Sequence, residues 1–228
     1  MTLKAVKGGP SLFTELNDAE LSAALSYGRP IIFRKDDTVI REGEAAKGIY
    51  LATSGVFACR KSSPSGLLFA LGKIKAQEFF GEAALVEGRP SEMEVVAACD
   101  ASALIFGVSD FNGLMERHPS ITLRMIEEMA LRISRLETLS FELATMKLDD
   151  RLKRTIESLA RESNQLHDGG VIRPAPTHAE LASMLGTTRE VISRSLTSLR
   201  RQGTIRTRRQ EIHIRSVNSL NWRLAEGS

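Results

Sequence analysis

The sequence predicts an α+β protein with an N-terminal antiparallel β-roll, one long helix and a C-terminal winged helix-turn-helix. Three observations predict this order. Short β-rich runs separated by turn residues fill positions 31–108, an uninterrupted helical pattern follows Pro119, and two short apolar helical segments meet at Gly186. The 228 residues suffice for two domains. We place the roll and its preceding helices at 1–118, the long helix at 119–148 and the helix-turn-helix domain at 149–228.

Short helices are expected before the roll. Asn17 or Asp18 supplies a cap or break, and the apolar positions recur at helical intervals, at Leu12, Leu16, Leu21 and Leu25. The β-rich runs that follow are separated by turn signals such as Gly88-Arg89-Pro90, at the spacing of a small sandwich or barrel. We expect a roll of about eight strands.

The two cysteines, Cys59 and Cys99, have no CxxC spacing. They indicate free thiols in a reducing compartment, with a redox switch as the alternative. Neither a membrane span nor a signal peptide is recognisable, so a cytoplasmic protein without membrane contact is expected. Iron–sulfur sensing would need a cluster of cysteines, and none of the four histidines lies between 31 and 108. We therefore predict no cofactor and no metal.

The long helix is expected to join two chains. Apolar residues after Pro119 step alternately by three and four, with Arg132 as the exception. A helix of ~30 residues extends ~45 Å, which is too long for a small roll to cover. We expect one face on the roll and the other on the same helix of a second chain; the alternative is a helix packed only within its own chain. The expected dimer contacts are Met125, Met129, Arg132, Leu136, Leu139 and Leu143.

A second apolar line through Ile126, Ile133 and Leu143 widens the stripe on this helix. Asp149-Asp150 offers a cap and a bend before the next amphipathic helix.

The C-terminal third is the basic part of the chain. Residues 151–215 contain 13 Lys or Arg against six Asp or Glu, a net charge of +7, whereas the remainder of the chain carries −4. This distribution suggests an anionic polymer as partner.

The stretch from Thr177 to Ile205 predicts a helix-turn-helix. Thr177 with Glu180, and Thr187 with Glu190, have the spacing of capping boxes. Gly186 lies where the first helix must end. The second helix begins with polar and charged side chains suited to the DNA major groove, and the candidate contacts are Thr188, Arg189, Glu190, Ser193 and Arg194.

Beyond Gly203 the pattern predicts a two-stranded wing. Ile205 and Thr207 alternate before a basic turn, and Ile212 and Ile214 alternate after it. Arg208 and Arg209 at the tip would contact backbone phosphate, which positions a protein on DNA without specifying sequence.

From about Phe13 to Arg215 the chain resembles the cAMP receptor protein/FNR (Crp/Fnr) family of bacterial transcription regulators. The resemblance rests on "REGEAAKGIYLATSGV", "FFGEAALVEGRP", the long helix after "RHPS" and "GTTREVISRSL". It implies a cyclic-nucleotide-binding-like roll of the double-stranded jelly-roll type, a dimerisation helix, and a winged helix-turn-helix on palindromic promoter DNA, with RNA polymerase as a further partner. Arg189, Glu190 and Arg194 fall on the family's base-reading positions.

The half-site remains open between two forms. Ser193 matches the FNR-like branch, whereas Arg189 is similar to the cAMP-receptor branch. The resemblance therefore implies either a TGTGA-like or a TTGA-like half-site.

The effector turn departs from the family pattern. Gly81 and Glu82 match the residues that meet phosphate and ribose in cyclic-nucleotide-binding members, but Ser91 and Glu92 replace the Arg-Ser phosphate clamp. Leu136-Glu137 replaces the Thr-Ser pair that meets adenine. Loss of the arginine and the added carboxylate cost on the order of 3 kcal/mol or more, at least about a hundredfold in affinity. We expect weak or no cAMP binding, with Gly81 and Glu82 serving either as a structural turn or toward another ligand.

Two rival functions agree less well with the sequence. A regulatory subunit of another protein also uses this kind of roll, but has no need of the polar pattern of 189–194. An enzyme is disfavoured because the sequence contains no recognisable nucleophile–base pairing, metal spacing or Walker-type loop.

Overall fold

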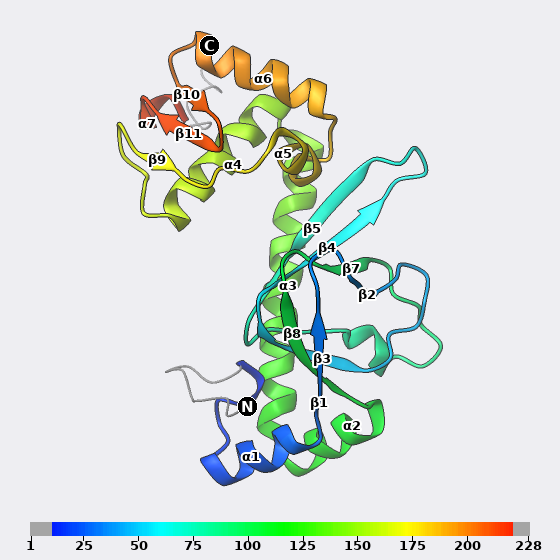
Figure 1. Cartoon of the computed structure of the whole chain (residues 1–228). Helices are drawn as coiled ribbons and strands as arrows, with labels where there is room; N and C mark the ends of the chain where they lie inside the picture. The colour runs from blue at the N-terminus through cyan, green and yellow to red at the C-terminus, as the bar shows by residue number, and fades with distance from the viewer. Residues whose placement is uncertain (1–10, 221–228) are drawn as a thin grey trace. The chain divides into compact units, whose positions relative to one another are not determined.

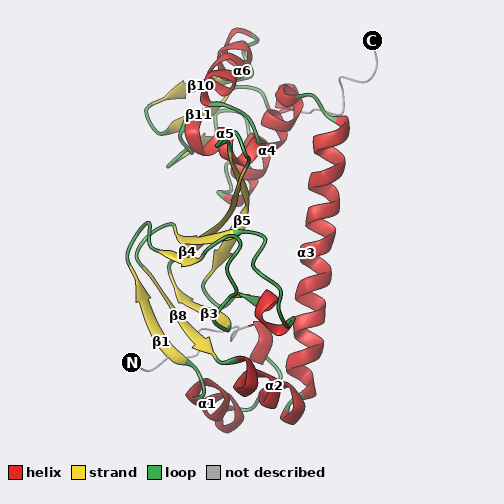
Figure 2. Ribbon diagram, turned by 90° about the vertical axis from the view of Figure 1, so that its right-hand side faces the viewer, coloured by secondary structure: helices red, strands yellow, loops and turns green. Residues whose placement is uncertain are grey.

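The computed structural model describes residues 11–220 (Figures 1 and 2). The described chain divides into two compact units. The first runs to Arg135 without Ser62–Ala70, and the second comprises Ser62–Ala70 and the residues from Leu136 on. The outer limits of the expected domains, residues 1 and 228, lie outside the described residues.

Short helices precede the roll, as predicted. A 3-10 turn, η1 (Ser11–Phe13), is followed by α1 (Asp18–Ser26). Asn17 is the N-cap of α1, and its side chain forms a capping box with Glu20. Leu12 and Phe13 are buried.

Two four-stranded antiparallel sheets form the roll, with strand orders β1-β8-β3-β6 and β2-β7-β4-β5. The fold class predicted from the sequence is thereby confirmed. The strands are β1 (Arg29–Phe33), β2 (Thr38–Ile40), β3 (Ile49–Ser54), β4 (Val56–Ser62), β5 (Leu68–Lys75), β6 (Phe79–Phe80), β7 (Glu94–Ala97) and β8 (Ala101–Phe106). The 3-10 turn η2 (Glu82–Leu85) lies between β6 and β7, and α2 (Val108–Arg117) follows β8.

Each sheet contributes to a buried aromatic core. Tyr50 and Phe80 stack with ring centroids 4.9 Å apart, and Phe57 lies 5.1 Å from Phe80. A second cluster joins Phe79, Phe106 and Phe111 to the helices that surround the first sheet. The alternation of side chains along the strands thus produces two apolar layers in the first unit.

The long helix α3 (Pro119–Thr145) begins against the roll. Ile121 and Met125 are buried in the core cluster that contains Phe79 and Phe106, and Met129 packs against this cluster. A neighbouring line of apolar side chains on α3 points away from this core cluster. Leu123, Ile126 and Ile133 are all more than half exposed, and with Ala130 they repeat at steps of three and four.

The expected dimer contacts Met125, Met129 and Arg132 lie toward the roll of their own chain, and their role at a dimer interface stays a prediction. Only 8% of Met125 is exposed, and Arg132 is bonded to the carboxylate of Glu82 in its own roll. Two neighbouring apolar lines run along this helix, and the roll covers the one that was assigned to a second chain. Leu136 and Leu143 are exposed and Leu139 is half-buried, so their role at a dimer interface stays a prediction.

The second unit contains a winged helix-turn-helix. Its elements are α4 (Leu148–Glu162), β9 (Val171–Ile172), α5 (His178–Leu185), α6 (Arg189–Arg201), β10 (Ile205–Arg208), β11 (Glu211–Ile214) and α7 (Val217–Leu220). The wing strands form an antiparallel sheet in the order β10-β11-β9. Leu181, Ile192 and Leu199 are fully buried in the core of this unit.

The expected cap at Asp149-Asp150 is wrong by two positions. The N-cap of α4 is Lys147, which makes no side-chain cap hydrogen bond, and both aspartates lie in the first turn. Their negative charges there still favour the start of the helix. Among the helices of residues 11–220, none combines the length and the apolar character needed to cross a bilayer.

Candidate nucleic-acid interface and effector turn

The turn between α5 and α6 is built by local hydrogen bonds. Thr177 caps α5 and forms the predicted capping box with Glu180. Gly186 ends α5 with φ of 62°, a left-handed conformation that glycine adopts without strain. The backbone N–H of Thr187 then donates to the carbonyl of Ala182 over 3.0 Å, which closes the helix end.

The second predicted capping box, Thr187 with Glu190, is wrong. Because Thr187 completes the end of α5, the N-cap of α6 is Thr188, and its side chain makes no cap hydrogen bond. Thr188 instead shares a hydrogen bond with the carboxylate of Glu190. The helix therefore starts one residue later than the motif indicates.

The first two turns of α6 carry the candidate DNA contacts. Arg189, Glu190 and Arg194 are exposed, and Ser193 is half-buried. Helical spacing places all four within an arc of about 140°. Donors and acceptors gathered on one face of a helix can contact base edges when that face lies in the major groove.

Glu190 is held in its charged form. A hydrogen bond from its own backbone N–H, and then one from the Thr188 hydroxyl, lower the pKa of this carboxyl below its ordinary value. The positive charges of Arg189 and Arg194 act in the same direction. An ionised carboxylate only accepts hydrogen bonds, so Glu190 suits a cytosine amino group and opposes a nearby phosphate.

A hollow of about 600 Å³ lies between α5, α6 and the wing turn. Three of the predicted contacts, Arg189, Arg208 and Arg209, line it together. Arg208 and Arg209 are exposed and have no ion-pair partner within residues 11–220. The structure thus brings the beginning of the second helix and the tip of the wing to one basic surface.

His178 also lines this hollow and was missed by sequence reasoning. Its ring nitrogen Nδ1 lies 2.8 Å from Oγ of Ser193. Fifteen positions separate the two residues, so no local motif signals the contact.

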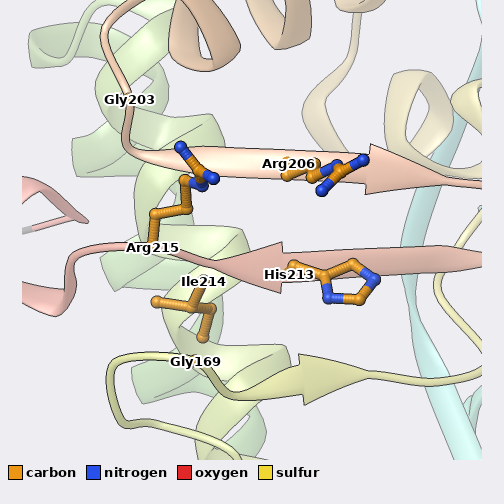
Figure 3. Close-up of a pocket in the computed structure, with 6 residues that line it drawn as sticks. All are labelled: Gly169, Gly203, Arg206, His213, Ile214 and Arg215. Carbon is orange, nitrogen blue, oxygen red and sulfur yellow. The ribbon is translucent and has the colours of Figure 1, made fainter.

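The outer face of the wing sheet carries further arginines that were missed. Arg206 pairs with His213 across β10 and β11, and Figure 3 shows both side chains with Arg215 around a hollow of about 560 Å³. Glu211, the acidic neighbour, is already bonded to Arg173 and to His213. Arg206 and Arg215 have no ion-pair partner in the described part of the chain, so their charge adds to the basic character of the wing.

The effector turn begins with a glycine that the backbone requires. Gly81 has φ of 85°, and a Cβ at this position would come within 2.6 Å of the Gly48 carbonyl oxygen. It would also lie 3.0 Å from the ring of Tyr50. Both the backbone conformation and the close approach exclude a larger residue.

Glu82 is bound to α3. Its Oε1 lies 3.2 Å from a guanidinium nitrogen of Arg132, and each side chain is about a quarter exposed. Arg132 also donates to the carbonyl of Phe79 and stacks over the Phe79 ring at 4.5 Å. The second oxygen, Oε2, is buried without a hydrogen-bond partner among the described residues.

Ser91 and Glu92 do not form a phosphate clamp. Ser91 is buried, and its hydroxyl donates to the Met93 carbonyl over 2.7 Å. Glu92 accepts from Lys61 over 3.1 Å, and this contact raises the pKa of the lysine. One side chain is turned inward and the other is an anion, so the pair does not fit a phosphodiester. Leu136 and Glu137, expected in place of the purine contacts, are exposed on α3.

The cysteines occupy unlike environments. Cys59 is buried on β4, and burial raises its pKa to about 11. Cys99 is exposed. A thiol with so high a pKa is protonated at neutral pH and a weak nucleophile, which disfavours the redox alternative at Cys59.

Two family models match this architecture. Residues 30–118 match the cyclic nucleotide-binding domain, and residues 150–221 match the Crp-like helix-turn-helix domain. The chain is 28% identical over 216 residues to the cyclic AMP receptor protein of Thermus thermophilus, covering 94% of this chain and 96% of the relative. It is 24% identical over 191 residues to the cAMP-activated global transcriptional regulator CRP of Salmonella typhimurium, with 82% and 90% covered.

Solved structures show the same fold. The c-di-GMP responsive global regulator CLP of Xanthomonas campestris has a TM-score of 0.78 at 20% identity, with 88% of this chain and all of that chain covered. A CooA mutant from Carboxydothermus hydrogenoformans has a TM-score of 0.76 at 18% identity, with 96% of both chains covered. The matched domains and relatives are those of transcription regulators and not of enzymes. This chain belongs to the Crp/Fnr family of DNA-binding transcription regulators.

Proposed function

We propose that this regulator binds a palindromic promoter site with TGTGA-like or TTGA-like half-sites, and that it does so as a homodimer. The observation that carries the proposal is the basic hollow lined by Arg189, Arg208 and Arg209. In this arrangement Arg189, Glu190, Ser193 and Arg194 read base edges, while Arg208 and Arg209 contact phosphate. Thr188 contributes indirectly, because its hydroxyl donates to the Glu190 carboxylate.

The dimer forms along α3. Leu123, Ile126, Ala130 and Ile133 repeat at steps of three and four on the face turned away from the roll, which is the spacing of a two-helix seam. A palindromic site then requires the two α6 helices of the dimer to enter major grooves about one helical turn of DNA apart. We assign 1–118 to an effector domain, 119–148 to dimerisation and 149–228 to DNA binding. RNA polymerase as a partner is carried over from the family resemblance.

The roll is proposed to bind cAMP weakly or not at all. Two contacts support this: the Ser91 hydroxyl already donates its hydrogen to the Met93 carbonyl, and the charge of Lys61 is already balanced by the Glu92 carboxylate. Isothermal titration of the purified protein with cAMP is expected to give no low-micromolar binding. A dissociation constant in that range would refute this part of the proposal.

Selection of bound sites from random duplex DNA tests the main proposal. We expect recovery of a palindrome with an FNR-like or cAMP-receptor-like half-site. Arg194→Ala should relax discrimination at one base pair by ~1–3 kcal/mol, whereas Arg208→Ala should weaken all sequences alike and lower the salt slope by about one. Equal effects of both substitutions, or retention of every oligonucleotide alike, would contradict the division between base and phosphate contacts.

A further inference from the structure

His178 connects the first helix of the motif to the base-reading helix. It is the first residue of α5, directly after the cap Thr177, and its side chain is exposed at the hollow described above. Its Nδ1 lies 2.8 Å from Oγ of Ser193 on α6. The Ser193 hydroxyl, a candidate base contact, therefore already takes part in one hydrogen bond within the protein.

That hydrogen bond limits what Ser193 offers to DNA. A serine hydroxyl has one hydrogen to donate and two lone pairs that accept. When Nδ1 carries no hydrogen, the hydroxyl hydrogen points at the ring, and only lone pairs face outward. When Nδ1 carries a hydrogen, the ring donates to Oγ, and the hydroxyl hydrogen is available to an outside acceptor. An unrestrained serine rotates to suit either kind of base edge.

We propose that His178 is a positioning residue that occupies one hydrogen-bonding site of the Ser193 hydroxyl and thereby sets its base preference. As an acceptor, Ser193 favours the amino groups of adenine and cytosine; as a donor, it favours guanine N7 and O6 or thymine O4. The proposal rests on the proposed function, because it requires α6 to lie in the major groove. It adds a specificity determinant that lies outside the base-reading helix.

The environment of the pair favours a role in recognition. The side chains that line the same hollow include Arg189, Arg208 and Arg209, all candidate DNA contacts. A second Ser193 interaction, in which Thr197 donates to the Ser193 carbonyl over 2.8 Å, involves only its backbone. Within residues 11–220 the imidazole is thus the hydrogen-bonding partner that orients the Ser193 side chain.

The test measures base preference in the full-length protein by quantitative sequencing of selected DNA. Ser193→Ala first identifies the base pair that this hydroxyl reads, as the position where preference falls. His178→Ala should lower preference at that same pair roughly fivefold, the value of one ordinary hydrogen bond, and leave the other positions unchanged. In the Ser193→Ala background, His178→Ala should have no further effect on preference.

Two further variants separate positioning from folding. His178→Asn retains a hydrogen-bonding group near the position of Nδ1 and should keep part of the preference. His213→Ala is the matched control, because His213 is also hydrogen-bonded, to Glu211, but lies on the wing sheet. It should leave the preference at the Ser193-dependent pair intact.

The outcomes distinguish the inference from the function beneath it. A wild-type protein that selects no sequence overturns both. A wild-type protein that selects a site, with a His178→Ala profile that is unchanged or uniformly weakened at all positions, overturns the inference alone. Additive losses of preference in the double variant do the same, because they show that His178 does not act through Ser193.

Discussion

Arg132→Ala should destabilise the segment from Phe79 to Leu85, which contains the effector turn, because Arg132 on α3 neutralises Glu82 in this segment. The pair is 3.2 Å apart, and both side chains are about three-quarters buried. Removing one partner from a fully buried pair costs ~3–5 kcal/mol, whereas an exposed pair contributes ~0–1 kcal/mol. The partial burial, the lost hydrogen bond to the Phe79 carbonyl and the lost contact with its ring place the expected cost at about 2 kcal/mol.

Hydrogen-exchange mass spectrometry measures this locally. Amides between Phe79 and Leu85, which form β6 and η2, should exchange roughly thirtyfold faster in the variant, since ~1.4 kcal/mol corresponds to a factor of ten. Arg124→Ala is the matched control on the same helix. Arg124 pairs with Glu15 and Glu127 at an exposed surface, and exchange of the Phe79–Leu85 amides should change less than about twofold.

A second substitution identifies the cause. In the Arg132→Ala background, Glu82→Gln removes the carboxylate charge that has lost its cation, so exchange of the Phe79–Leu85 amides should slow again. Equal exchange in the Arg132 and Arg124 variants would refute the reasoning. So would a Glu82→Gln substitution that accelerates exchange further, because the ion pair would then not be the source of the stability.

Four other results are expected. Ile133→Glu places a charge on the outward apolar line of α3 and should convert the proposed dimer to monomers in sedimentation velocity at micromolar concentration, whereas an unchanged dimer would exclude this seam. Iodoacetamide at pH 8 should modify Cys99 and spare Cys59. Because the pKa of Cys59 is raised to about 11 from an ordinary 9.0, the free energy of unfolding should fall as the pH rises from one value to the other. Thr177→Ala removes the capping box of α5 and should cost ~1 kcal/mol, seen as roughly fivefold faster exchange in its first turn; no change would show that the cap contributes nothing.

The helix-turn-helix was predictable because its signals are local. A cap three residues before a glutamate, and a glycine at a helix end, constrain the backbone over one or two turns, and Thr177 and Gly186 act as expected. The error at Thr187 has a local origin as well. A capping box needs the Thr187 N–H for the Glu190 carboxylate, but this N–H donates to the Ala182 carbonyl, and the sequence pattern alone does not show which partner it takes.

The covered face of α3 was not predictable, because two apolar lines one residue apart are equally suited to burial. Arg132 resembles an exception in an apolar seam. Its partner Glu82 is fifty positions earlier in the chain, and only the fold brings the two together. The contact of His178 with Ser193 is hidden for the same reason, since it depends on the crossing of α5 and α6.

The Gly81-Glu82 pair illustrates how a binding motif can be explained without its ligand. Gly81 has a left-handed backbone and lies against the Gly48 carbonyl, so it is required by the roll itself. Glu82 neutralises Arg132 and fixes α3 to β6 and η2. This role requires a carboxylate with or without a bound nucleotide. The residues that would have to hold a phosphate are instead engaged with Met93 and Lys61. The part of the motif that stabilises the fold is therefore present, whereas Ser91 and Glu92, in place of the phosphate clamp, have other partners in this chain, and this supports the proposed weak binding of cAMP.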